Sequence, residues 1–428
     1  MHWSLFAHPK RERGTTSMCG ISRDHESCSA RQKGLLKKVF GDIVLLCLST
    51  AMLGQGVQQS QPASALKRSA AQHRLPITKF YDTPVPLPRG KPGELIRSAP
   101  FGLKAQPVEA VRILYYSRSG GGELVADSGV VLFPEGKTPT GGWPVIGWAH
   151  PLDGVARSCA PSLTPNLLPG PFLSMYVNLG YAVVATDYTG LGTNFRNAAG
   201  DMRSNAMDVM YSIAAARSAV PSLGSRWVAM GTGEGARAAI EISELTQQMP
   251  DANYLGSVAI SQISDLTDLL QPSGNQSHEL PLLLAYGIKT AFPQFDPKDI
   301  LTEQALPLYR QFEQECEVSE ADKIPVAGML TEHWESNKFV QDYFARNRLG
   351  TAGMGAPLLV IDSEGDPYIM STAKVVTRLC KQGNKVLFNR YAEYDSGQVI
   401  GDSVRDQMAW IQERFAGKQP RTNCAGEH

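Results

Sequence analysis

The chain of 428 residues is electrically balanced, with 41 lysines and arginines against 41 aspartates and glutamates. It therefore has no basic field that would recruit nucleic acid and no charged interaction tail. A hydrophobic fraction of 43% with 8% aromatic residues indicates a globular protein, long enough for one large domain or two ordinary ones.

The N-terminal region has the composition of an export signal. Three lysines between residues 33 and 38 precede an apolar run, Ile43 to Leu53, and the small-residue sequence Ala63-Ser64-Ala65 follows. These are the charged, apolar and A-x-A parts of a signal peptide, and the apolar run is too short to span a membrane. A buried helix of the domain is the alternative. We expect residues 1–65 to be an export signal with an upstream extension, and the protein to be secreted or periplasmic.

Strand-like and helical runs alternate after a proline-rich, aperiodic stretch, residues 66–105, which predicts an extended arm. Residues 110–117 and 127–134 predict an opening antiparallel pair. Later runs are short, apolar and β-branched, as is typical of strands buried on both faces; they cover residues 143–150, 181–188, 226–231, 256–261, 357–365 and 385–394. A helix is predicted over residues 204–220, with Ser204 or Asn205 as its cap. The alternation predicts an α/β fold with a mostly parallel, doubly wound sheet.

The stretch "GTGEG", Gly231 to Gly235, follows a predicted strand and opens an alanine-rich helix. This is the strand–turn–helix context of the nucleophile elbow, G-x-S-x-G, with Gly233 where the serine would stand. A glycine has no side chain that could attack a carbonyl carbon. An ordinary glycine-rich turn is the alternative.

Residues 264–353 interrupt the alternation with apolar helical sequence. We expect them to form a helical cap over the ligand end of the strands, between core segments 106–263 and 354–428. A merely structural subdomain is the alternative. If the cap covers a pocket, its apolar side chains are expected to line it; they are Leu282, Leu283, Leu284, Tyr286, Ile288 and Phe292.

Four cysteines follow the expected export signal, Cys159, Cys316, Cys380 and Cys424. An even number in an exported chain suggests disulfides, with three possible connectivities. None of the four belongs to a C-x-x-C motif or stands beside clustered histidines, so we expect no metal site and no cofactor.

Three segments of the core together resemble a known family. They read "GWAHPLDGVARSCAPSL", "NLGYAVVATDYTGLGT" and "RWVAMGTGEGARAAIEISEL". From about Arg112 to Cys424 the chain resembles the fungal and bacterial secretory lipases, which are α/β-hydrolases with a helical cap. The resemblance implies hydrolysis of acylglycerol or other lipid carboxylic esters. It also implies the disulfides Cys159–Cys316 and Cys380–Cys424, the first of which joins the sheet to the cap.

The resemblance implies three catalytic positions, of which the chain keeps one. The nucleophile position is Gly233, the acid position is Asp366 and the base position is Ser396. A serine hydroxyl is not a useful base near neutral pH. The family's His-Gly oxyanion loop reads His150-Pro151 here, and we place Leu152 and Glu234 with it.

No other histidine is an evident substitute for the missing base. His428 is the only one after Asp366, at the chain end, and His333 lies in the expected cap. Three hypotheses follow. The protein is a non-catalytic homologue that binds a lipid or acyl ester, with possible contact to a lipid interface. Alternatively it is an active esterase with an unconventional site, in which Glu234 or His333 orients water, or it is a structural or interaction domain.

Overall fold

The computed structural model describes residues 74–102, 108–167, 170–261, 263–270, 278–392 and 395–424, all within one compact unit of residues 61–428. The expected export signal, residues 1–65, lies outside the described residues, as does the first part of the expected arm. In the part that is described, no helix combines the length and apolar composition needed to cross a membrane.

Nine strands of the described chain form one sheet in the order β1-β2-β3-β5-β4-β6-β7-β8-β9. The pairs from β1 to β5 are antiparallel, and every pair from β5 to β9 is parallel, which confirms the mostly parallel sheet and its antiparallel opening. The strands are β1 Leu95–Pro100, β2 Glu109–Arg118, β3 Leu124–Phe133, β4 Trp143–Ala149, β5 Ala182–Thr186, β6 Leu223–Thr232, β7 Tyr254–Ile260, β8 Leu358–Ser363 and β9 Val386–Tyr391. Strand β1 falls within the residues predicted as an arm, so the sheet begins before residue 106.

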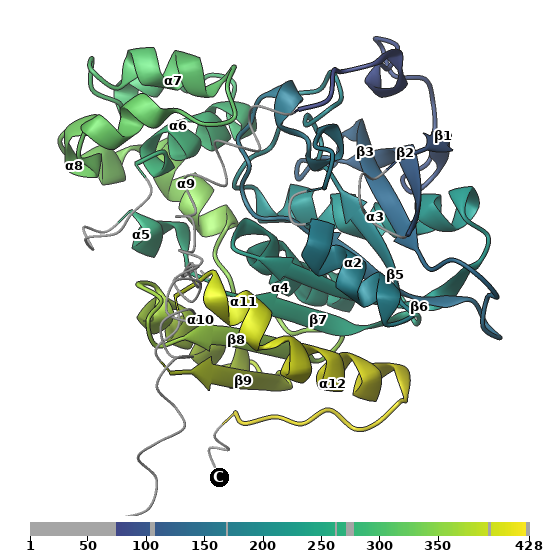
Figure 1. Cartoon of the computed structure of the whole chain (residues 1–428). Helices are drawn as coiled ribbons and strands as arrows, with labels where there is room; N and C mark the ends of the chain where they lie inside the picture. Colours follow the sequence, from purple (N-terminus) through teal and green to yellow (C-terminus); the bar gives the residue numbers. More distant parts are fainter. Residues whose placement is uncertain are drawn as a thin grey trace, which may run out of the picture. The chain divides into compact units, whose positions relative to one another are not determined.

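Helices pack on both faces of the sheet (Figure 1), which confirms the doubly wound prediction. Because side chains of a strand alternate between faces, Val228 and Met230 of β6 face one helical layer while Trp227 and Ala229 face the other. The first layer contains α2 Gly170–Asn178, α11 Gln398–Asp402 and α12 Val404–Phe415. The second contains α3 Met202–Ala219, α4 Glu234–Gln248 and α10 Ile369–Lys381.

Helix α3 begins earlier than the sequence predicts. Its N-cap is Asp201, whose carboxylate accepts a hydrogen bond of 3.0 Å from the backbone N–H of Ser204. The predicted caps, Ser204 and Asn205, are therefore wrong, and both are buried inside the first turns. An aspartate accepts from the free N–H groups of a helix start as well as serine does, so Asp201 competes on equal terms.

The segment between β7 and β8 is helical and has a core of its own, which confirms the helical cap insertion. Its helices lie together in Figure 1; they are α5 Leu266–Leu269, α6 Leu280–Ala291, α7 Leu306–Phe312, α8 Val326–Met329 and α9 Lys338–Arg346. The Cys159–Cys316 disulfide ties this cap to the core, with 5.4 Å between the two Cα atoms. A Cβ at Gly154 would lie 2.7 Å from the Cα of Cys316, so only glycine fits beside the bridge.

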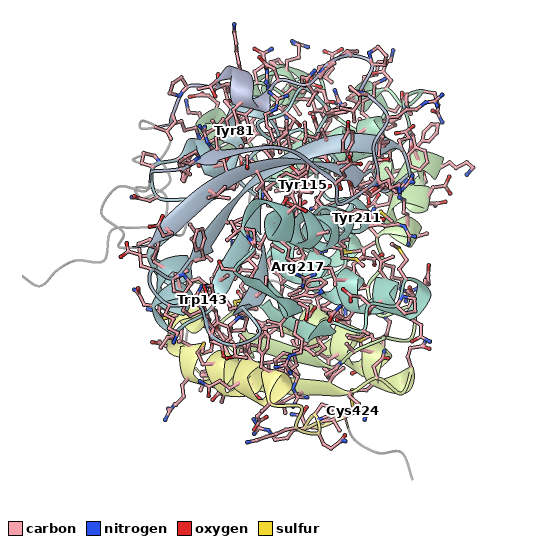
Figure 2. All side chains as sticks on the ribbon, turned by 90° about the vertical axis from the view of Figure 1, so that its right-hand side faces the viewer. Tyr81, Tyr115, Trp143, Tyr211, Arg217 and Cys424 are labelled. Atoms are coloured by element: carbon pink, nitrogen blue, oxygen red, sulfur yellow. A yellow bond between two sulfur atoms is a disulfide. The ribbon has the colours of Figure 1, made fainter. Side chains whose placement is uncertain are left out.

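A second disulfide, Cys380–Cys424, fastens the C-terminal segment to helix α10. Figure 2 shows Cys424 at the edge of the molecule beside the last strands. The two bridges are the pairings that the family resemblance implies.

Candidate functional site

The turn between β6 and α4 has the backbone of a nucleophile elbow. Gly233 stands between them with φ 56° and ψ −119°, a conformation that glycine adopts freely and that strains other residues. Its N–H lies 3.3 Å from the carbonyl oxygens of both Ile260 and Ser261, and its own carbonyl accepts from Ala236 at 3.1 Å. The chain is therefore held in a sharp strand-to-helix turn at the carboxyl end of the parallel strands.

The glycines on either side of the elbow centre, Gly231 and Gly235, allow close contact between backbone segments. A Cβ on Gly231 would overlap the carbonyl oxygen of Gly235, and a Cβ on Gly235 would overlap the carbonyl oxygen of Ala149. Helix α4 thus begins in direct contact with the backbone of β4. The "GTGEG" sequence is explained by this close approach and by the positive φ at its centre.

The expected acid and base positions are in contact. Asp366 follows β8 and is 2% exposed. Its Oδ2 accepts a hydrogen bond of 2.7 Å from Ser396 Oγ, and its Oδ1 accepts one of 2.7 Å from the N–H of Tyr368. The hydroxyl at position 396 thus donates to the carboxylate from the place where an imidazole would donate in a catalytic triad.

Ser261 connects the elbow to the acid, and sequence reasoning missed it. Its Oγ lies 3.2 Å from Oδ2 of Asp366, while its carbonyl oxygen faces the N–H of Gly233. Ser261 has φ 60° and comes directly after β7. Its place after a buried parallel strand was the available signal, because ligands of such sheets bind at the carboxyl ends of the strands.

A second carboxyl group beside Asp366 titrates near neutral pH. Burial, and next the charge of Asp366, raise the pKa of Asp362 to about 7. Thr372 Oγ1 donates to Asp362 at 2.6 Å, and the N–H of Ser363 donates at 2.8 Å. These bonds hold the buried Asp362 near the carboxyl end of β8.

The expected oxyanion loop is fixed by its own contacts. His150 is 2% exposed and stacks on Tyr188 with 4.1 Å between ring centroids. Its Nδ1 lies 2.6 Å from the carbonyl oxygen of Pro151, and its Nε2 lies 3.0 Å from that of Asp187. Both ring nitrogens face backbone carbonyl oxygens. The ring holds the loop in place.

Glu234 and Leu152 lie at the border of core and cap. Oε1 of Glu234 accepts from the N–H of Gly200 at 2.6 Å and from Nδ2 of Asn205 at 3.1 Å. Leu152 packs against the apolar cluster of the cap. Oε1 of Glu234 is thereby engaged with one backbone N–H and one side-chain amide.

Of the two alternative histidines, only His333 lies within the described residues. The side chain of His333 is 80% exposed on the cap, beside Glu332. His428 lies outside the described residues. No group of three or more histidine, cysteine, aspartate or glutamate residues in the described part is arranged to hold a metal ion.

A small cavity lies between α5, α6 and α9. It has a volume of about 10 Å³, room for roughly one water molecule. Its walls are Gly200, Leu266, Leu269, Leu270, Leu280, Leu283, Leu284 and Tyr343. Only Leu283 and Leu284 of the six side chains predicted as pocket lining belong to these walls.

The other four predicted lining residues pack inside the cap. Leu282 and Ile288 are fully buried in its core. Tyr286 lies under the guanidinium of Arg196, 4.2 Å from ring centroid to carbon, and Phe292 lies 5.5 Å from the ring of Phe339. Helix α6 has apolar residues on most of its surface, and most of them pack against other cap residues. The sequence alone does not show which of them line a cavity.

The sequence is similar to known lipases. The family model described as secretory lipase matches residues 171–423. A Mycobacterium tuberculosis protein named as a probable inactive lipase is 25% identical over 374 residues, which cover 79% of this chain and 82% of that protein.

Solved structures show the same fold. Candida antarctica lipase A in its closed state superposes with a TM-score of 0.70 at 17% identity, covering 82% of this chain and 89% of the lipase. The rice cell wall degrading esterase LipA from Xanthomonas oryzae superposes with a TM-score of 0.64 at 18% identity, covering 77% of this chain and 100% of the esterase. The nine-stranded sheet with its flanking helices and cap is thus an α/β-hydrolase fold.

Proposed function

The chain belongs to the secretory lipase family, and we propose that it is a catalytically impaired member that binds a lipid or acyl ester under its cap. One observation carries this proposal. The elbow backbone is intact, yet the residue at its centre is Gly233, and the residue that contacts the acid is Ser396 rather than a histidine.

The impairment follows from the chemistry of these two positions. Without a side chain at Gly233 no acyl-enzyme forms, and Ser396 donates to Asp366 where a base would have to accept a proton. Loss of the triad in a serine hydrolase costs on the order of 10⁶ in turnover. The remaining rate depends on an oxyanion hole, and Pro151 offers no N–H to one. The similarity to a probable inactive lipase supports the same conclusion.

Lipid binding is proposed from the family and from the composition of the cap. Lipid esters are the ligands that the lipase family suggests. Six leucines wall the cavity between the cap helices α5, α6 and α9, a composition that suits an acyl chain. The cavity of about 10 Å³ holds no such chain, so binding requires helices α5 and α6 to separate from α9. Each methylene then buried contributes about 0.8 kcal/mol.

Export is proposed from the N-terminal sequence. The secretory lipase family and the two disulfides fit an extracellular protein. We propose that residues 1–65 are removed on export. We also propose that residues 264–353 form the cap between two core segments, the first of which begins with β1 at Leu95 and ends at residue 263, while the second covers residues 354–428. N-terminal sequencing by mass spectrometry of the extracellular or periplasmic fraction tests this, and an intact cytosolic N-terminus with free thiols contradicts it.

The purified mature protein, treated with a serine-directed fluorophosphonate and a short-chain chromogenic ester, tests the impairment. We expect neither labelling nor turnover above background, beside a family member with an intact triad that shows both. The rival hypothesis, an esterase with an unconventional site, predicts robust turnover. Turnover that survives Asp366→Ala unchanged would show that the proposed site is not the place of catalysis.

A further inference from the structure

Helix α4 carries a buried cation that has no evident partner. Arg237 is 3% exposed, and its Nε and Nη2 atoms are buried without a hydrogen-bond acceptor among the residues that the structure describes. Guanidinium remains charged in proteins, and a buried charge is costly unless it is paired. A structural arginine would direct these N–H groups at carbonyl or carboxylate oxygens.

The carboxylates whose charges act on Arg237 are already engaged with other donors. Glu234 accepts from the backbone of Gly200 and from Asn205. Asp201 pairs with Arg346 at 2.6 Å, and Asp265 accepts two bonds from Arg378 at 2.8 and 2.9 Å. In the described part of the chain none of the three forms an ion pair with Arg237. Burial lowers the pKa of Arg237 from its ordinary value, in keeping with a charge that lacks a full partner.

Arg237 stands in the first turn after the elbow, and its charge acts on Tyr343, a residue of the cavity wall. Its N–H bonds to the carbonyl of Gly233, 3.3 Å away, so it belongs to the first turn of the 15-residue helix α4. The N-terminus of such a helix carries unpaired N–H groups and a partial positive charge. Arg237 also lies close enough to Tyr343 of the cavity wall for its charge to act on that side chain. Gly200, another wall residue, donates to the neighbouring Glu234.

We propose that this site binds a free fatty acid, with the carboxylate on Arg237 at the start of α4 and the acyl chain among the leucines under the cap. The proposal rests on the lipid-binding function above and deepens it by naming the ligand class. Guanidinium and carboxylate form a bidentate pair, which would engage two N–H groups at once. Because Gly233 has no side chain, no serine hydroxyl occupies the centre of the elbow turn. A neutral ester offers the same chain but no charge for Arg237.

The experiment compares ligands of equal chain length. The mature protein is titrated calorimetrically with decanoate, methyl decanoate and acetate. We expect decanoate to bind at least about tenfold more tightly than the methyl ester, and acetate to bind far more weakly than decanoate because it lacks the chain. Arg237→Met, which keeps the length of the side chain and removes its charge, should bind acid and ester equally well.

A control variant separates the site from general charge. Arg196→Met removes one positive charge at the cap border. The side chain of Arg196 is 44% exposed, and its guanidinium lies over the ring of Tyr286. It should keep the preference of the wild type for decanoate. If the wild type binds acid and ester equally, or if Arg237→Met keeps the preference, the fatty-acid proposal fails while lipid binding stands. If neither ligand binds the wild type, the proposed function itself fails.

A second measurement needs no variant and covers the case in which Arg237→Met does not fold. Decanoate labelled with ¹³C at its carboxyl carbon is titrated with acid while bound to the wild type. Pairing with Arg237 should keep the bound carboxylate ionised to a lower pH than the free acid. A bound acid that titrates at the same or a higher pH overturns the proposal.

Discussion

The double substitution Gly233→Ser and Ser396→His should restore measurable ester hydrolysis. The side chain at position 396 already contacts Asp366, with 2.7 Å between Ser396 Oγ and the carboxylate. An imidazole at this position can donate to Asp366 through one nitrogen and accept from the elbow hydroxyl through the other. Restoring nucleophile and base together matters, because the two act as a unit.

The same change should cost stability. Gly233 has φ 56° and ψ −119°, where a residue with a Cβ is strained by about 1–3 kcal/mol. With an unfolding entropy of about 2.1 cal/mol/K per residue, the compact unit of residues 61–428 should lose about 1–4 °C in Tm. Gly233→Ala is the matched control, because it has the same backbone strain and no hydroxyl.

The assay is turnover of a short-chain chromogenic ester together with fluorophosphonate labelling. We expect the double variant to exceed the wild type at least about a hundredfold, and to lose this gain when Asp366→Ala is added. Gly233→Ala with Ser396→His should be inactive and lose as much Tm. A double variant that folds, is not labelled and does not turn over the ester would refute the assignment of positions 233, 366 and 396 to one site.

Three further predictions concern stability. Gly235→Ala should lower the free energy of unfolding by about 2–3 kcal/mol in urea titrations, because its Cβ would overlap the carbonyl of Ala149. Gly383→Ala is the comparison: its Cβ would meet no atom within 4 Å, so it measures the cost of a positive φ alone. Burial, and next the charge of Glu244, raise the pKa of Glu241 to about 7, so the folded state binds a proton that the unfolded state releases near pH 4.5. Stability should fall as pH rises from about 4.5 to 7, and Glu241→Gln should raise the free energy of unfolding by about 2–3 kcal/mol at pH 8 with little effect at pH 4; an unchanged pH profile contradicts this. Replacing Cys159 and Cys316 by serine opens a loop of 157 residues and should cost about 2–5 kcal/mol, whereas an unchanged urea midpoint shows that the bridge does not restrain the unfolded chain.

The strands and most helices could be predicted because their signals are local. Runs such as residues 181–188 are apolar and β-branched throughout, and the structure buries every residue of β5, Ala182–Thr186, on both faces. The elbow was predictable for the same reason, since a strand, a glycine-rich turn and a helix follow one another directly. Helix α3 shows the limit, because Asp201 and Ser204 are both acceptable caps and only the packed structure selects one.

The contacts of the site could not be predicted, because they join residues far apart in the chain. Ser261 contacts Asp366 across 105 positions; its place after a buried strand puts it at the ligand end of the sheet, but the local sequence does not identify its partner. The partners of His150 and the choice of Leu283 rather than Leu282 beside the cavity depend equally on packing. The buried, unpaired state of Arg237 also appears only in the folded chain.

Asp366 has a structural role that does not depend on catalysis. Its carboxylate accepts from Ser396, Ser261 and the N–H of Tyr368, and so ties the ends of β7 and β8 to the turn before α11. Replacement by alanine would leave the buried hydroxyl of Ser261 and the N–H of Tyr368 without this acceptor, at a cost of about 1–3 kcal/mol for each. The other two positions contribute to the fold in other ways. Glycine at position 233 avoids the strain of the elbow turn, and Ser396 donates a hydrogen bond to Asp366. These contacts stabilise the fold through a carboxylate at position 366, and this role does not depend on a nucleophile at 233 or a base at 396.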